Sequence, residues 1–339
     1  MTIILFSLLI FLLILPFVPG VRELWRKEDA APLYINMESH REPRYFGLAF
    51  RKMLKRSLAG YAGARGVFSI SLSKQEQIEV VDTAAIGDNS NIKNIYYVEK
   101  TLQTGSKVVF EKEIYACGDV IIGENNRLRA LACDGDIRIL QGTKFTRWLD
   151  AEGNIRVDEQ CSLGVSAACG QELSISRQCL FKRLYGFPVV TLPCLDAGKP
   201  VTEKGESFQT DGVRQDEPER NLSIVPAHSR QHCDFIAAHS LIIGEYAIID
   251  GHIKTHGDLT AAPEVTILGN IFAEGNIRIG PHCKVLGTIF TQGHILLEKG
   301  VTIGTYYTVK SVISKKGITL HSGVKIFGFV STDGEGRVV

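Results

Sequence analysis

The chain has 339 residues, of which 45% are hydrophobic, and its 38 basic residues nearly balance 37 acidic ones. A net charge of +1 gives no electrostatic reason to expect nucleic acid as a partner. The eight cysteines include no Cys-x-x-Cys pair, which argues against a zinc ribbon or a redox motif, so we expect small buried side chains and neither a metal nor a cofactor.

Residues 3–18 form an almost wholly apolar run. Sixteen helical residues would span about 24 Å, against about 30 Å for a bilayer core. Basic residues follow the run at Arg22, Arg26 and Lys27, which by the positive-inside rule keeps the rest of the chain in the cytoplasm. A cleaved signal peptide is the alternative, although no basic residue precedes the run and no A-x-A-like site follows it. We predict an anchor in the inner (cytoplasmic) membrane within residues 1–20, formed by Ile3, Ile4, Leu5, Phe6, Leu8, Leu9, Ile10, Phe11, Leu12, Leu13, Ile14 and Leu15.

Residues 21–66 form a basic juxtamembrane region. Between positions 41 and 65 there are seven basic residues and one acid, Glu42, and apolar residues such as Phe46, Phe50 and Leu54 recur at helical spacing. One interpretation is an amphipathic helix that rests on anionic lipid. The other is a helix that covers the open end of the neighbouring domain and is basic only on its solvated face.

A first β-helix block is predicted for residues 67–194. Gly118, Gly135, Gly153 and Gly170 recur at a nearly constant spacing, and a short strand with alternating apolar residues follows each of them. Asp or Asn follows the first three glycines. Because such side chains commonly hydrogen-bond their own turn, we interpret them as turn residues rather than as metal ligands or catalytic groups.

Residues 195–222 are polar, charged and almost free of aromatic residues, which predicts a flexible loop between two blocks. Beyond it, residues 240–311 divide into four lines of equal length that align with one another. One column reads Leu241, Leu259, Ile277 and Ile295, and glycine recurs at fixed positions between such columns. Three short strands per line, joined by corners that glycine suits, make a triangular coil whose apolar residues are buried only against the next coil. The predicted fold is therefore all-β, a parallel β-helix of about 17–18 residues per coil. Its second block covers residues 223–339.

The last coil departs from this repeat and then the sequence stops. About five extra residues are expected at 312–317, after which Ile318, Leu320 and Ile326 resume the pattern. No polar helix follows, although the end of a solenoid presents strand edges and an apolar interior that pair with another chain unless they are covered. We predict a polymer interface formed by Ile326, Phe327, Phe329 and Val330.

The strand starts of the type Gly-[DN]-[ILV]-x-[IL] and the corners of the type x-[IV]-x-Gly-x-[IV] within residues 257–293 resemble those of bactofilins, the bacterial polymer-forming cytoskeletal family. The resemblance covers residues 237–334 and, more loosely, 117–186. It implies a right-handed β-helix and nucleotide-free polymerisation through the helix ends. It also implies a membrane-associated scaffold of bacterial cell shape. The expected function is therefore non-catalytic, with further copies of this chain, the lipid bilayer and an unidentified protein cargo as partners. The chain differs from the family pattern in its length, its apolar N-terminus, its additional repeat block and its central loop.

An enzyme is the alternative. A coil of three hexads also resembles the hexapeptide acyltransferases, which use a histidine base. A polysaccharide lyase is less favoured, because Arg138 and Arg156 share a column that no column of acids accompanies. The candidate bases are His252, His256, His282, His294 and His321.

Overall fold

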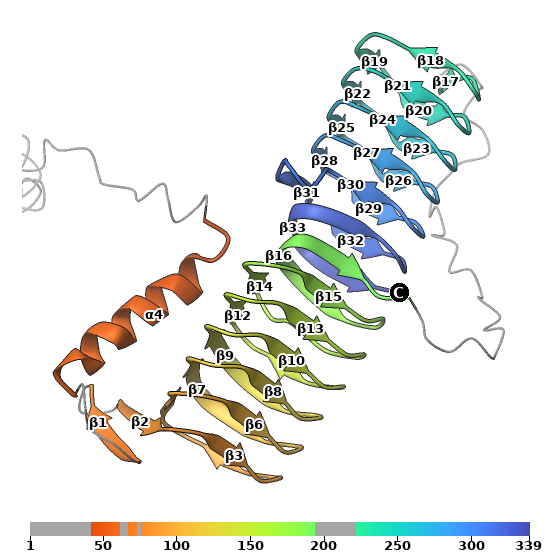
Figure 1. The fold of residues 1–339 in the computed structure, drawn as a ribbon. Helices are drawn as coiled ribbons and strands as arrows, with labels where there is room; N and C mark the ends of the chain where they lie inside the picture. Colours follow the sequence, from red (N-terminus) through yellow and green to blue (C-terminus); the bar gives the residue numbers. More distant parts are fainter. Residues whose placement is uncertain (1–41, 62–66, 73–75, 194–221) are drawn as a thin grey trace, which may run out of the picture. The chain divides into compact units, whose positions relative to one another are not determined.

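The computed structural model describes residues 42–61, 67–72, 76–193 and 222–339 (Figure 1). In these residues it is an all-β solenoid of about 13 turns with one α-helix, α4 (Tyr45–Leu58), and a short 3-10 turn, η2 (Ala59–Tyr61). The predicted parallel β-helix is therefore confirmed. The predicted anchor and nearly all of the predicted loop lie outside the described residues. Residues 43–339 form one compact unit.

The strands fall into two sets separated by residues 194–221. The first set is β1 (Phe68–Ser71), β2 (Gln77–Val81), β3 (Ala84–Ile86), β4 (Asn91–Ile92), β5 (Ile95–Val98), β6 (Leu102–Thr104), β7 (Val109–Ala116), β8 (Val120–Ile122), β9 (Arg127–Cys133), β10 (Ile137–Ile139), β11 (Lys144–Phe145), β12 (Trp148–Ala151), β13 (Ile155–Val157), β14 (Ser166–Cys169), β15 (Leu173–Ile175) and β16 (Leu180–Thr191). We call these strands the first block.

The second block has shorter and more regular strands. They are β17 (Leu222–Val225), β18 (Arg230–Gln231), β19 (Phe235–Ala237), β20 (Ser240–Ile243), β21 (Ile248–Ile249), β22 (Ile253–Thr255), β23 (Leu259–Ala261), β24 (Thr266–Ile267), β25 (Ile271–Ala273), β26 (Ile277–Ile279), β27 (Lys284–Val285), β28 (Ile289–Thr291), β29 (His294–Leu297), β30 (Thr302–Ile303), β31 (Lys310–Ser314), β32 (Gly317–Leu320) and β33 (Lys325–Val338).

Identical positions of successive coils stack in parallel register. In the first block, Ile137 pairs with Ile155, Arg138 with Arg156, and Ile139 with Val157. The strand pleat sends the apolar members of each strand inward, where they are buried, and leaves the arginines exposed. Each fully buried branched side chain contributes about 1.5–3 kcal/mol of transfer free energy, so the stacked core is the main source of stability.

The second block keeps a constant repeat until one insertion. Ile271 pairs with Ile289 in the next coil, and Ile289 pairs with Val312, so that the second step along the chain is five positions longer than the first. The five additional residues form a turn around Thr305 and Thr308, which face each other in an antiparallel bridge. The insertion was predicted at 312–317. This placement was wrong, because residues 312–314 belong to β31 and residue 317 begins β32, with only a two-residue bend between them.

The corner residues act between coils rather than within a turn. The carboxylate of Asp136 accepts a hydrogen bond from the backbone N–H of Asn154, and Asp258 does the same for Asn276 in the second block. At one corner column the backbones of successive coils approach so closely that only glycine fits. A Cβ at Gly269 would collide with the carbonyl of Gly251. The predicted structural role of these residues is confirmed, but its mechanism is coil-to-coil contact.

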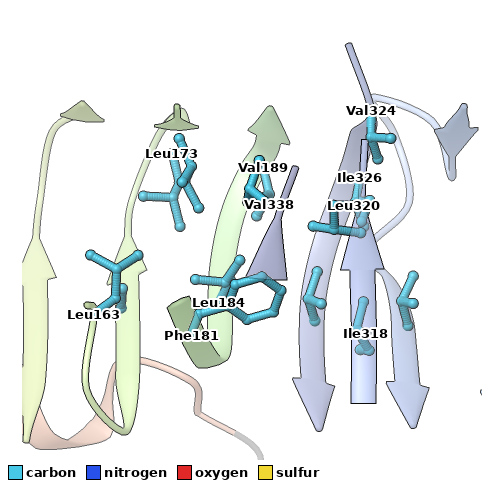
Figure 2. Packing of buried hydrophobic residues seen from close by; sticks show 14 of the residues in the cluster. Leu163, Leu173, Phe181, Leu184, Val189, Ile318, Leu320, Val324, Ile326 and Val338 are labelled. Carbon is cyan, nitrogen blue, oxygen red and sulfur yellow. The ribbon is translucent and has the colours of Figure 1, made fainter. Parts of the chain in front are cut away.

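The two blocks meet through their C-terminal coils. β16 of the first block pairs antiparallel with β33 of the second, with Leu184 opposite Val330 and Val189 opposite Ile326. Figure 2 shows side chains from both sides of this contact in a shared apolar layer. At this contact the strands of the second block therefore run antiparallel to those of the first.

Candidate functional site

The predicted polymer interface lies inside this contact, which we call the junction. Ile326 and Val330 are fully buried, Phe329 is opposite Tyr185, and the ring of Phe327 lies 5.6 Å from that of Phe187. The last coil is therefore not bare, and that expectation was wrong. Its physical basis was sound, because the edge does pair with another sheet edge, but the partner strand is β16 of the same chain.

The junction is held by hydrogen bonds in addition to apolar packing. The hydroxyl of Thr191 donates to the carbonyl of His321 at 2.6 Å and accepts from the N–H of Val324 at 2.8 Å. The Val338 N–H donates to the Cys179 carbonyl at 3.0 Å. Edge groups on both sides are thereby satisfied, as buried polar backbone requires.

The opposite end of the second block is different. β17, β18 and β19 each pair with one strand only, β20, β21 and β22 respectively, and no other strand in the described part of the chain pairs with them. Their outward side chains include Leu222, Ile224 and Ile236, which are 47%, 64% and 75% exposed. We call this coil the open end. Unpaired strand edges beside apolar side chains are a template for pairing with another chain.

The starting end of the first block is partly covered. β1 pairs antiparallel with β2 and so occupies its outer edge, with Ile70 opposite Ile78. β3 and β4 pair only with β6 and β7 among the described strands. The sequence pattern predicts that this segment belongs to the first block but does not indicate the antiparallel hairpin, because a short stretch of alternating residues does not identify its partner strand.

Helix α4 packs along the flank of the first block and not over its end. Leu54 is fully buried, and Phe50 meets Trp148 edge-on with ring centroids 5.4 Å apart. Arg51 is buried; its Nε donates to Asp134 at 2.8 Å and its Nη atoms reach Asp150 and the Cys133 carbonyl. The helix was interpreted as a possible cover for an exposed end of the neighbouring block. For the described residues this interpretation is wrong, because acids on β12 and beside the end of β9 bind the cationic inner face of the helix.

Asp150 is the centre of this ion-pair network. Its side chain is 3% exposed and accepts hydrogen bonds from Arg44 at 3.0 Å as well as from Arg51. Burial raises the pKa of Asp150, while the two guanidinium groups act in the opposite direction. At the rim, the hydrogen bond from Arg44 lowers the pKa of Glu152. The cluster fixes the helix to the sheet.

Five of the described cysteines behave as small core residues, whereas Cys117 is half-buried and Cys233 is exposed. Cys133, Cys161, Cys169, Cys179 and Cys283 are buried and unbridged. Burial raises the pKa of Cys133 and of Cys169 to about 12 and that of Cys283 to about 11, so these thiols stay protonated at neutral pH. Within the described ranges no group of His, Cys, Asp and Glu side chains could hold a metal ion.

The candidate catalytic histidines have structural or surface contacts. His252 Nδ1 accepts the backbone N–H of Asn270 at 3.0 Å, which makes it part of a corner ladder. His256 Nδ1 lies 2.8 Å from Glu274, and both side chains are nearly half exposed. Burial, with help from nearby Lys316 and Arg337, lowers the pKa of His294. The ring of His282 lies against Gly300. The backbone carbonyl of His321 accepts the hydrogen bond from Thr191 at the junction.

In the part of the chain that the structure describes, no helix is both long enough and apolar enough to cross a bilayer. Comparison with known proteins found no matching family model, no matching curated protein and no matching solved structure. The resemblance to bactofilins therefore stays a prediction. The described residues form a two-block β-solenoid whose C-terminal coils are joined, and in which β17, β18 and β19 have no second partner strand among the described strands.

Proposed function

We propose that this protein is a non-catalytic, membrane-associated scaffold that polymerises through its β-helix ends without a nucleotide. The predicted inner-membrane location with the solenoid in the cytoplasm, and the unidentified protein cargo, belong to this proposal. The β-solenoid is a fitting framework, because stacked coils give a stiff rod whose ends are sheet edges.

The open end is the observation that carries the proposal. β17, β18 and β19 present three strand edges in one coil, and the adjoining apolar side chains are exposed. At the junction, the same repeat joins end to end by antiparallel pairing of β16 with β33. Since coils of this sequence pair in that way within the chain, a second copy is a suitable partner for the open end.

Contacts of two kinds are needed for a polymer. Pairing of two open ends is isologous and gives a closed dimer, whereas growth also needs a contact at the starting end of the first block. The outer edges of β3 and β4 are available for that contact in the described structure. We therefore propose the open end as the stronger contact and the β3–β4 edge as the weaker one, used at higher concentration.

Ile236 offers a sharp test of the open end. The neighbouring Phe235 N–H donates to the His252 carbonyl inside the block, and N–H groups alternate sides along a strand, so that of Ile236 faces the free edge. Ile236→Pro removes this donor without breaking a bond within the block. Ile236→Thr, the matched control, keeps the donor and a β-branched side chain.

We expect Ile236→Pro to weaken self-association at least tenfold, and Ile236→Thr to weaken it far less, as measured by analytical ultracentrifugation and electron microscopy of the purified protein. Circular dichroism would verify that both variants keep their β content. A wild-type protein that stays monomeric at high concentration would contradict the scaffold proposal. Equal assembly by wild type and Ile236→Pro would remove the open end from it.

The hexapeptide-repeat acyltransferase remains the second candidate because of the His256–Glu274 pair. A histidine oriented by a carboxylate is a suitable general base. An acyl donor such as acetyl-CoA would then raise the melting temperature of the protein. His256→Gln would leave this binding largely intact but abolish acyl transfer. No melting shift with acetyl-CoA would exclude this candidate.

A further inference from the structure

From the geometry of α4 we propose that its outer face binds the surface of an anionic phospholipid bilayer and holds the solenoid flank against it. This inference rests on the membrane association in the proposed function and names the residues that make the contact. It separates two roles of one basic helix, since the inner face is bound to the solenoid and the outer face is exposed among the described residues.

The inner cations of α4 are already used. Arg44 and Arg51 are bound to Asp150 and Glu152, and both have mostly buried side chains. Lys55 is 3.4 Å from Asp134 at the edge of an open groove of about 680 Å³ beside the helix. Arg44 and Arg51 therefore attach α4 to the first block and are not available to a membrane, whereas the Lys55 side chain stays largely exposed.

The outer face carries apolar and basic side chains together. Phe46 and Met53 are 52% and 43% exposed, and Ala49 lies exposed between them. Lys52 and Arg56 are exposed on the adjoining side of the same face. The sequence of α4 contains no acidic residue at all. Exposed Phe and Met beside Lys and Arg are typical of helices that lie in the headgroup layer, where the cations stay in water while their stems and the apolar groups enter the lipid.

The chain that precedes α4 makes a bilayer the fitting occupant. Positions 19–41 separate the apolar run from Glu42, and a segment of that length reaches at most about 80 Å when fully extended. A run held in the bilayer would therefore keep α4 within about 80 Å of the membrane, which raises the effective concentration of the helix at the headgroups. Each basic residue near an anionic surface contributes about 1 kcal/mol, so two of them shift the local equilibrium roughly 30-fold.

The test uses the full chain with Phe46→Trp and vesicles of phosphatidylcholine, with or without phosphatidylglycerol, that carry brominated acyl chains. Bromine quenches tryptophan that enters the lipid. We expect quenching beyond that of the parent chain in anionic vesicles and little in neutral ones. Adding Lys52→Gln and Arg56→Gln should shift the equilibrium between lipid-bound and free α4 roughly 30-fold toward the free state. The additional quenching should then disappear.

The matched control is Arg138→Gln with Arg156→Gln, which removes two exposed cations from β10 and β13 and should leave the quenching unchanged. A chain that co-sediments with anionic vesicles but leaves the introduced tryptophan unquenched would overturn this inference and leave the membrane association standing. A chain that does not co-sediment would overturn both. If Lys52→Gln and Arg56→Gln change assembly size without any lipid effect, the face contacts protein and the lipid assignment is wrong.

Discussion

The two ends of the second block are built from the same repeat and have opposite surroundings. At the junction, β33 pairs along most of its length with β16, and Ile326 and Val330 are fully buried. At the open end, β17 and β19 have one partner strand each among the described strands, and Ile224 and Ile236 are largely exposed. The comparison teaches that an apolar terminal coil needs a partner edge. The sequence of the coil does not reveal which segment or chain supplies that partner.

Breaking the junction should have the largest effect. Leu184 is fully buried opposite Val330. Leu184→Asn removes apolar volume, at about 2–5 kcal/mol, and buries an amide without its partners, at a further ~1–3 kcal/mol. Urea unfolding should show a loss of about 4 kcal/mol or more. The neighbouring exposed residue gives a control, Lys182→Asn, which should change stability by less than about 0.5 kcal/mol. Wild-type stability for Leu184→Asn would mean that the blocks do not join as described.

The flank of the first block supplies the second prediction, since α4 is fixed there by buried charge instead of strand pairing. Arg51→Met leaves Asp150 buried with Arg44 as its remaining close cation. Losing one partner of a buried ion pair costs about 3–5 kcal/mol, and we expect the lower value because Arg44 stays.

The readout is faster proteolysis within α4 together with a lower urea midpoint. Arg51→Met combined with Asp150→Leu should recover part of the loss, because the combination leaves no unpaired buried charge. A double variant less stable than Arg51→Met alone would show that shape, and not charge, fixes the helix.

The smallest effect concerns pH and the coils next to the junction. Burial lowers the pKa of His294 in the folded protein, and Lys316 and Arg337 add to this shift. The unfolded chain therefore binds a proton more readily, so stability should fall as pH decreases below the unfolded value of about 6.5. His294→Gln should flatten this part of the stability profile, as measured by thermal unfolding between pH 7.5 and 5.5. A steeper profile in the variant would contradict the sign.

Much of the fold could be predicted from residue patterns. The Leu241–Leu259–Ile277–Ile295 column stacks in the order and register that the repeat indicates. The corner Asp and Asn residues and the buried cysteines also have the structural roles expected of them. The position of the five-residue insertion was wrong, because a short period fixes the register of each coil but not where extra residues bulge between two of its strands.

The candidate site was harder to predict. Ile326 and Val330 were identified as residues that need an apolar partner, which they have, but that partner is β16, which is far from them in sequence. The ion pairs of Arg44 and Arg51 with Asp150 likewise join distant segments of the chain. A basic amphipathic segment reveals neither which of its cations meet acids nor which face is left for another surface.

By itself, the sequence determined the repeating unit: its period, its inward and outward positions and its corners all follow from local strand geometry that recurs once in every coil. Only the tertiary structure decided how the two stacks of coils meet, which of the described strands keep a free edge and which face of α4 is exposed in the described residues. The reason is physical, because these features depend on surfaces formed by distant segments, and apolar and charged groups are satisfied by any suitable partner that the folded chain brings within reach.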